Sequence, residues 1–142
     1  MKIGIASDHR GVILKEKIKN YLNDRYQIID YGTNSIESVD YPQYAYKIGE
    51  AVHDKKIDLG ILICGTGIGM SIACNKVKGV RCAKVNDKEE AFLARLHNNA
   101  NVIALSEKTT DYKEIIDTFL TTNFSDEEKH QRRVEMIDKY DN

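Results

Sequence analysis

Short apolar runs rich in β-branched residues alternate along the chain with longer stretches in which apolar residues recur every three or four positions. The short runs are typical of buried strands, and the longer stretches are typical of amphipathic helices. Strands that alternate with helices pair in parallel, and the helices then cover both faces of the sheet. We expect five strands, at Lys2–Ala6, Tyr26–Tyr31, Asp58–Cys64, Gly79–Val85 and Asn101–Leu105.

This alternation predicts an α/β fold, namely a three-layer α/β/α, Rossmann-like single domain with a five-stranded parallel sheet. A length of 142 residues is ordinary for one domain, and no repeat or linker-like stretch divides it, so we expect one domain over residues 1–142. The last helix is so rich in charge that we expect it to pack only partly on the core. Helices are expected at about 12–22, 44–52, 69–77, 87–96, 111–120 and 126–140.

Composition and charge exclude several classes of partner. Lys and Arg number 21 against 22 for Asp and Glu, so a large cationic surface for nucleic acid is not expected. The apolar runs are far shorter than the roughly 20 residues that cross a bilayer, and the first strand follows Met1 too closely for a signal peptide. Three widely spaced cysteines suit a reducing compartment. We therefore expect a cytoplasmic protein with no nucleic-acid or membrane partner.

Two groups of reactive residues follow expected strands, where open parallel sheets bind their ligands. The first is Asp8–His9 and the second is the segment Cys64–Gly69, whose three glycines let the backbone approach a ligand and whose N–H groups could hold an anion. The glycine pattern fails as a dinucleotide fingerprint at Met70, and it lacks the Gly-Lys-Ser/Thr ending of a Walker A loop. A plain strand-to-helix turn is the simpler alternative for such a loop.

Single residues of these groups also have simpler explanations. Cys64 ends a strand beside a helix N-terminus, where a cysteine can act as a base or nucleophile, although a buried structural thiol is the more common role. Asp8 could simply cap the next helix, and His9 would lie in its first turn. Cys74 and Cys82 are expected to be apolar fillers. The shared sheet edge favours the functional interpretation.

Metal and hydrolase chemistry find little support in the sequence. The four histidines are scattered, with no Cys-x-x-Cys and no His-x-x-x-His pair, so we expect no metal site. There is no Gly-x-Ser-x-Gly motif, although a Cys64–His97 pair leaves a cysteine hydrolase open. Lys129 and Arg133 lie four apart on the last helix and could grip an anion together, but a solvated charged face is the simpler alternative.

Several short motifs follow one another along nearly the whole chain. With these motifs in this order, the chain closely resembles type B ribose-5-phosphate isomerases. The same family also holds galactose-6-phosphate isomerase subunits. Together the ordered motifs are far more specific than any one of them. They are Ser7-Asp8-His9, Gly32-Thr33, Asp40-Tyr41-Pro42, Ile63-Cys64-Gly65-Thr66-Gly67, Ala73-x-Asn75-Lys76, Gly79-x-Arg81, His97-Asn98 and His130-x-x-Arg133-Val134.

The resemblance implies a metal-free aldose–ketose isomerase of the pentose phosphate pathway, with no cofactor, that interconverts D-ribose 5-phosphate and D-ribulose 5-phosphate through a cis-enediolate. In matching positions, Cys64 is the general base, and Thr66 carries the hydroxyl beside the migrating proton. His97 is the acid that opens the sugar ring, with Asp8 assisting. The positions expected to bind substrate are Asp8, His9, Tyr41, Gly65, Thr66, Gly67, Ile68, Gly69, Asn98, Lys108, Lys129 and Arg133.

The phosphate ligands depart from the family pattern. The family usually has Arg at the positions of Lys108 and Lys129, and only Arg133 keeps it. Lysine binds phosphate as a point charge and not as a planar fork, so the identity of the sugar stays open. The alternatives are another phosphorylated sugar (allose or galactose 6-phosphate, or a tetrose phosphate), one half of a hetero-oligomeric galactose-6-phosphate isomerase, or a non-catalytic sugar-phosphate-binding relative.

Topology predicts how the chain assembles. Asp8 and Cys64 follow strands, whereas His97 and Asn98 directly precede one, so the two groups lie at opposite edges of the sheet. Strands of about 17–20 Å separate these edges too widely for one side chain to bridge. We therefore expect a homodimer whose active sites are shared between subunits, as in the family that the chain resembles, with a tetramer left open. The helix at about 126–140 is expected to contribute to the phosphate site and to the dimer interface.

Overall fold

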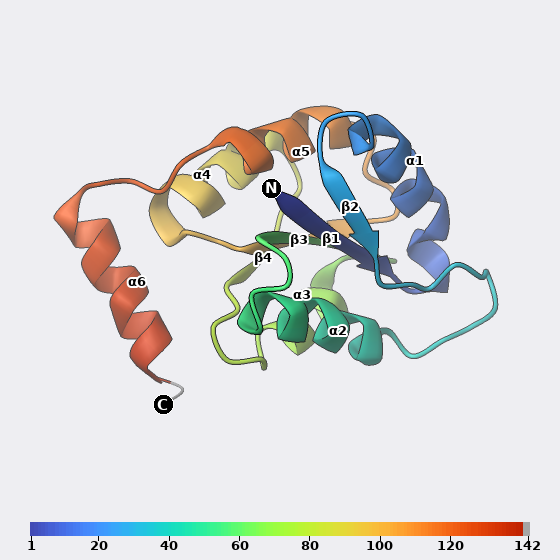
Figure 1. Ribbon diagram of the computed structural model, residues 1–142, viewed down its shortest axis with the longest axis horizontal. Coiled ribbons are helices and arrows are strands. Elements are labelled where there is room, and N and C mark those ends of the chain that lie inside the picture. The colour runs from blue at the N-terminus through green and yellow to red at the C-terminus, as the bar shows by residue number, and fades with distance from the viewer. Residues whose placement is uncertain (141–142) are drawn as a thin grey trace.

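The computed structural model describes residues 1–140 as a single five-stranded sheet between two layers of helices (Figure 1). Every strand pair is parallel, and the strand order is β2-β1-β3-β5-β4. The expected fold class is therefore confirmed. The strands are β1 (Lys2–Ser7), β2 (Gln27–Asp30), β3 (Leu59–Cys64), β4 (Cys82–Lys84) and β5 (Val102–Ser106).

The three central strands form the middle of the core because both of their faces are covered. Ile5 of β1 is paired with Ile61 of β3, which in turn is paired with Ile103 of β5, and all three side chains are fully buried. All six residues of β3 are buried. A continuous apolar run of this kind is what a strand covered on both faces requires. Because side chains alternate between faces, Ile63 and Cys64 belong to different core clusters.

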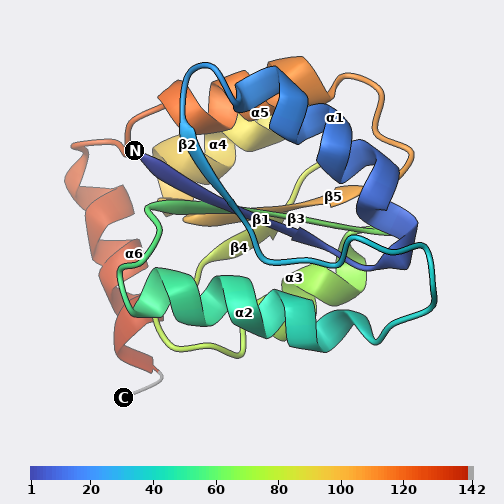
Figure 2. The ribbon, with the colours of Figure 1, turned by 45° about the vertical axis from the view of Figure 1, so that its right-hand side comes forward.

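The helices divide between the two faces of the sheet (Figure 2). Residues of α1, α4 and α5 pack in one core cluster, and residues of α2 and α3 pack in the other. A short 3₁₀ helix, η1 (His9–Gly11), directly precedes α1. The α-helices are α1 (Val12–Leu22), α2 (Tyr41–His53), α3 (Ile68–Cys74), α4 (Lys88–Asn98), α5 (Tyr112–Thr121) and α6 (Glu128–Tyr140).

Two elements, β4 and α3, each lose three residues at one end relative to the range that the sequence pattern predicts. We expected β4 to span 79–85, but ladder pairing covers only Cys82–Lys84, because the Arg81 N–H donates to the Asn101 side chain. We expected α3 to extend to residue 77, but it ends at Cys74, where the Asn75 amide turns to bond both the N–H and the carbonyl of Cys82. In both cases an asparagine side chain replaces regular backbone pairing.

Helix α6 lies at one end of the molecule, apart from the two helical layers (Figures 1 and 2). Val134 is its one buried residue among those described, and Arg81 Nη1 forms an ion pair with Asp138 at 2.9 Å. The expectation that this helix packs only partly on the core is confirmed. Within residues 1–140, no helix is long and apolar enough to cross a bilayer.

Candidate active site

Cys64 and the glycine loop that follows it lie at the carboxyl edge of the sheet. Cys64 is the last residue of β3, and 5% of its surface is exposed. The Gly67 N–H donates a hydrogen bond of 3.1 Å to its Sγ atom. The sulfur is therefore held at the mouth of the loop with a backbone donor directed at it.

A side chain at Gly67 or Gly69 of this loop would clash with a neighbouring segment. Gly67 has a φ of +81°, and a Cβ there would lie 3.0 Å from the carbonyl carbon of Leu105. A Cβ on Gly69 would lie 2.6 Å from the ring of Tyr41, the first residue of α2. Tyr41 therefore packs directly on the first turn of α3. The structure thus brings Tyr41 to the loop that the sequence associates with substrate, while Ile68 in the same turn is 53% exposed.

Asp8 follows β1, the neighbour of β3 in the sheet, and caps the next turn. Its Oδ1 accepts hydrogen bonds from the N–H groups of Arg10 at 3.0 Å and Gly11 at 3.1 Å. The capping alternative is therefore confirmed, and Asp8 is buried at the edge that also carries Cys64. A further role for Asp8 in ring opening stays a prediction.

Thr66 Oγ1 accepts the Ile68 N–H at 3.2 Å and so helps to start α3.

His9 connects this edge to the loop between β2 and α2. Its Nδ1 accepts the Val39 N–H at 3.2 Å. A neutral imidazole that accepts at Nδ1 carries its hydrogen on Nε2, so this bond selects the tautomer with an Nε2–H donor. The loop thus fixes which nitrogen of His9 can donate to a ligand.

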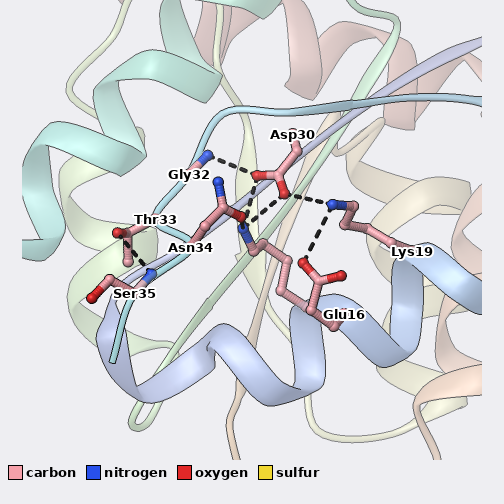
Figure 3. Close-up of polar contacts among 8 residues, drawn as sticks. Glu16, Lys19, Asp30, Gly32, Thr33, Asn34 and Ser35 are labelled. Atoms are coloured by element: carbon pink, nitrogen blue, oxygen red, sulfur yellow. Dashed lines mark hydrogen bonds and ion pairs between the residues drawn. The ribbon is translucent and has the colours of Figure 1, made fainter. Parts of the chain in front are cut away.

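A buried cation, Lys15, contacts the start of the same loop. The Lys15 side chain is fully buried, and its ammonium group donates to Asp30 and to the Asn34 side chain at 2.7–2.8 Å. Lys19 and the Gly32 N–H also donate to Asp30 (Figure 3). Burial opposes ionisation of Asp30, but these donors outweigh it and lower the pKa of the carboxyl below its ordinary value.

The segment after β5 completes the carboxyl edge. Ser106 Oγ donates to the Gly65 carbonyl at 2.9 Å, and the Glu107 N–H donates to the Cys64 carbonyl at 2.9 Å. The Lys108 N–H in turn donates to Ser106 Oγ. These bonds place Lys108 beside the glycine loop, at the edge that also carries Asp8, His9 and Tyr41.

The remaining candidate residues form a second group at the other end of the sheet. His97 and Asn98 end α4, just before β5 begins. The His97 ring stacks on His130 of α6, with 4.1 Å between ring centroids and 10° between planes. Burial lowers the pKa of His130, and the neighbouring positive charge of a protonated His97 lowers it further. Lys129 and Arg133 lie on the same helix.

The structure does not bring these two groups together within one chain. All strands are parallel, so residues after strands and residues before strands lie at opposite edges. The expected separation of His97 and Asn98 from Cys64 is confirmed, and a Cys64–His97 hydrolase pair within one subunit is wrong. For the same reason Lys108 does not converge with Lys129 and Arg133 in a single chain.

The sequence did not single out Arg10 and Glu107 at the carboxyl edge of the sheet, or the contact of His130 with His97 at the opposite edge. Arg10 and Glu107 form an ion pair at the carboxyl edge, 97 positions apart, and no periodicity or motif links them. His130 stood within a motif of the resemblance, which was the one signal available for it. Its contact with His97 depends on how α6 meets α4, and the sequence pattern does not specify that packing.

The chain matches a known protein family and curated relatives over nearly its whole length. The profile of the Ribose/Galactose Isomerase family matches residues 3–137. The chain is 44% identical to a putative sugar phosphate isomerase of Bacillus subtilis, over 99% of this chain and 97% of that protein. It is 42% identical to ribose-5-phosphate isomerase B of Escherichia coli, over 96% of this chain and 93% of that one.

A solved structure extends the agreement to three dimensions. Ribose-5-phosphate isomerase B of Clostridium thermocellum superposes with a TM-score of 0.95 at 45% identity, covering 99% of this chain and 97% of that chain. The match thus spans both groups of candidate residues. The resemblance to type B ribose-5-phosphate isomerases is confirmed, and the chain is an isomerase that belongs to the ribose/galactose isomerase family.

Proposed function

We propose that this chain interconverts D-ribose 5-phosphate and D-ribulose 5-phosphate by moving a proton between C1 and C2 of the open-chain sugar. The observation that carries the proposal is the position of Cys64 Sγ, which accepts the Gly67 N–H at the mouth of the glycine loop. A relative from Mycoplasma genitalium, 44% identical with a TM-score of 0.91 over 99% of this chain and 95% of that one, has been solved with bound ribulose 5-phosphate. The reaction would belong to the pentose phosphate pathway of the cytoplasm.

The proton transfer follows from the groups at the carboxyl edge. The Cys64 thiolate removes the proton from C2 of the aldose, and the electron pair moves through C1 to the carbonyl oxygen, giving a cis-enediolate. The N–H groups of Gly67 and Ile68 already bond to Cys64 Sγ and Thr66 Oγ1, so the developing oxyanion is assigned to the other backbone N–H groups of residues 65–69. The Thr66 hydroxyl lies beside the migrating proton. Return of the proton from sulfur to C1, with transfer of the O2 proton to O1, gives the ketose.

Ring opening must precede this step, and we assign it to His97 of a second copy of the chain. His97 and Cys64 lie at opposite edges within one chain, so a homodimer is needed to combine them. Ile68 and Ile72 of α3 lie four apart beside the glycine loop and are 53% and 61% exposed, which is typical of an interface with a partner. Asp8 assists at the ring oxygen, and Asn98 and Tyr41 contact the sugar.

The phosphate group is assigned to hydrogen-bond donors from both edges. Lys108 and the Nε2–H of His9 reach it from the subunit that supplies Cys64. Lys129 and Arg133 reach it from the partner, where they accompany His97 at the α4–α6 contact. We therefore assign α6 to both the phosphate site and the dimer interface.

Turnover of ribose 5-phosphate in deuterium oxide tests this proposal. We expect ribulose 5-phosphate to form with deuterium at C1, because the cysteine proton exchanges with solvent between removal and return. Allose 6-phosphate, galactose 6-phosphate and erythrose 4-phosphate serve as competitors, and we expect kcat/KM to be highest for ribose 5-phosphate. A higher value for another sugar would reassign the substrate. Absence of turnover with all four would leave a protein that only binds sugar phosphates.

A further inference from the structure

The ion pair between Arg10 and Glu107 crosses the end of the strand that carries Cys64. Arg10 follows β1 and Glu107 follows β5, and β3 lies between these two strands in the sheet. Arg10 Nε and Nη2 donate to the two carboxylate oxygens of Glu107 at 3.2 Å and 2.8 Å. Glu107 is itself fixed, because its N–H donates to the Cys64 carbonyl. The guanidinium plane is therefore held in one orientation above the mouth of the site.

The third nitrogen of this guanidinium faces the glycine loop. A Cβ built on Gly65 would lie 2.6 Å from Arg10 Nη1 and 2.9 Å from Cζ, so the absence of a side chain at Gly65 makes room for the cation. Within residues 1–140, Nη1 donates no hydrogen bond. Its N–H donors thus remain available to a ligand at the loop.

The surroundings of the pair favour an anion. A groove of about 430 Å³ next to it is lined by the cations Arg10, Lys17 and Lys108 and by one acid, Glu107. The hydrogen bond and the charge of Glu107 raise the pKa of Arg10, so the guanidinium stays charged at all working pH values. Half of the Arg10 side chain is exposed (52%), so a ligand in the groove can reach it.

We propose that Arg10 is a phosphate-binding residue of the isomerase site, held in position by Glu107. The assignment rests on the proposed function and names a residue that the sequence motifs do not contain. It also accounts for a departure noted above. Lys108 supplies a point charge where relatives usually have a guanidinium, and Arg10 supplies a planar guanidinium from the neighbouring strand end.

The direct test measures the affinity of the intact protein for inorganic phosphate by calorimetry, alongside the KM for ribose 5-phosphate. Arg10→Ala should weaken phosphate binding roughly 10- to 100-fold, the range for a hydrogen bond to a charged group, and should raise KM more than it lowers kcat. Arg10→Lys should lie between, because it keeps the charge and loses the fork. Glu107→Gln should bind phosphate as tightly as the wild type or more tightly, because it keeps an acceptor for Arg10 and removes a repelling charge.

Two controls separate this assignment from its rivals. Lys17→Ala removes another cation of the same groove, and an equal loss of affinity in Lys17→Ala and Arg10→Ala would show a general charge effect and overturn the assignment. If the pair only braces the loop, Glu107→Gln should weaken phosphate binding as Arg10→Ala does, and that result would also overturn it. Phosphate affinity is measured without turnover. A wild type that binds phosphate through Arg10 but does not isomerise ribose 5-phosphate would therefore refute the proposed function and leave this assignment standing.

Discussion

At the scale of single residues, the proposed chemistry depends on one sulfur atom and the donor directed at it. Cys64 is one of three free cysteines, and what distinguishes it is its place at a strand end with the Gly67 N–H at 3.1 Å. Cys74 is fully buried in α3, and Cys82 lies on the edge strand β4. The hydrogen bond to Cys74 and burial raise the pKa of the Cys82 thiol, as expected of thiols that fill space.

Replacing Cys64 with alanine should abolish proton transfer and leave the fold intact. We expect kcat to fall by at least ~10²-fold, the lower end of the range for losing a general base. Deuterium incorporation at C1 should be lost in parallel, as measured by NMR of the product. Cys74→Ala is the matched control, because it removes a buried thiol away from the loop and should keep near-normal turnover. Normal exchange in Cys64→Ala would refute the assignment.

The stacked histidines predict a pH dependence of stability. Burial and the charge of His97 lower the pKa of His130 in the folded chain, so the unfolded chain binds its proton more readily. The free energy of unfolding should therefore carry no penalty from His130 above about pH 6.5, the ordinary histidine pKa. It should decrease as the pH falls below that value. In His130→Phe, which keeps a ring for stacking, the urea midpoint should change less between pH 7.5 and 5.5. His53→Gln, at an exposed histidine, is the control. An unchanged pH dependence in His130→Phe would contradict this explanation.

At the scale of elements, a charged network helps to hold the loop between β2 and α2. Lys15 reaches from α1 to Asp30 at the end of β2 and to Asn34 in the loop. Further along the loop, the Val39 N–H bonds to His9, and α2 then begins at Tyr41. Two residues proposed to contact substrate therefore depend on how this loop is held.

Asp30→Asn tests that network. It leaves the fully buried Lys15 ammonium without its counter-charge, so we expect a loss of about 3–5 kcal/mol in the free energy of unfolding at pH 7. Because the pKa of Asp30 is lowered in the folded chain, its contribution is complete above about pH 4 and is lost as the pH falls through the lowered value. Urea unfolding between pH 7 and 3 should show this acid loss in the wild type and less of it in the variant.

Glu16→Gln is the control for the same network. Glu16 pairs with Lys19 at an exposed position, so its loss should stay within about 0.5 kcal/mol at pH 7. Equal effects of Asp30→Asn and Glu16→Gln would show that the buried charge pair has no special importance for the loop.

Particular elements explain which features the sequence could predict. The apolar run within Asp58–Cys64 predicted a strand that ends at Cys64, and the structure confirms a buried strand over Leu59–Cys64. A lysine on an amphipathic helix is expected to face solvent. Lys15 is nevertheless fully buried, because Asp30 of β2 and Asn34 of the following loop accept hydrogen bonds from its ammonium group. Contacts between side chains far apart in sequence, such as Arg10 with Glu107, depend on tertiary geometry that no local pattern encodes.

At the scale of the whole molecule, the topology divides the proposed site between two edges of one sheet. Cys64, Asp8 and Lys108 lie at the carboxyl edge, and the stacked His97 and His130 lie at the opposite end beside α6. A two-fold dimer would form two equivalent composite sites, each with Cys64 from one chain and His97 from the other. The central claim is that the isomerase site forms only between two copies of the chain.

Mixing two inactive variants tests that claim most directly. Cys64→Ala and His97→Ala are each expected to be inactive with ribose 5-phosphate. After subunit exchange, verified by native mass spectrometry of the heterodimer, one site of each mixed dimer carries both lesions and the other is intact. Random pairing makes half of the dimers mixed, so about a quarter of the wild-type isomerase activity should return. No recovery despite verified heterodimers would place both residues in the site of one subunit and contradict the shared active site.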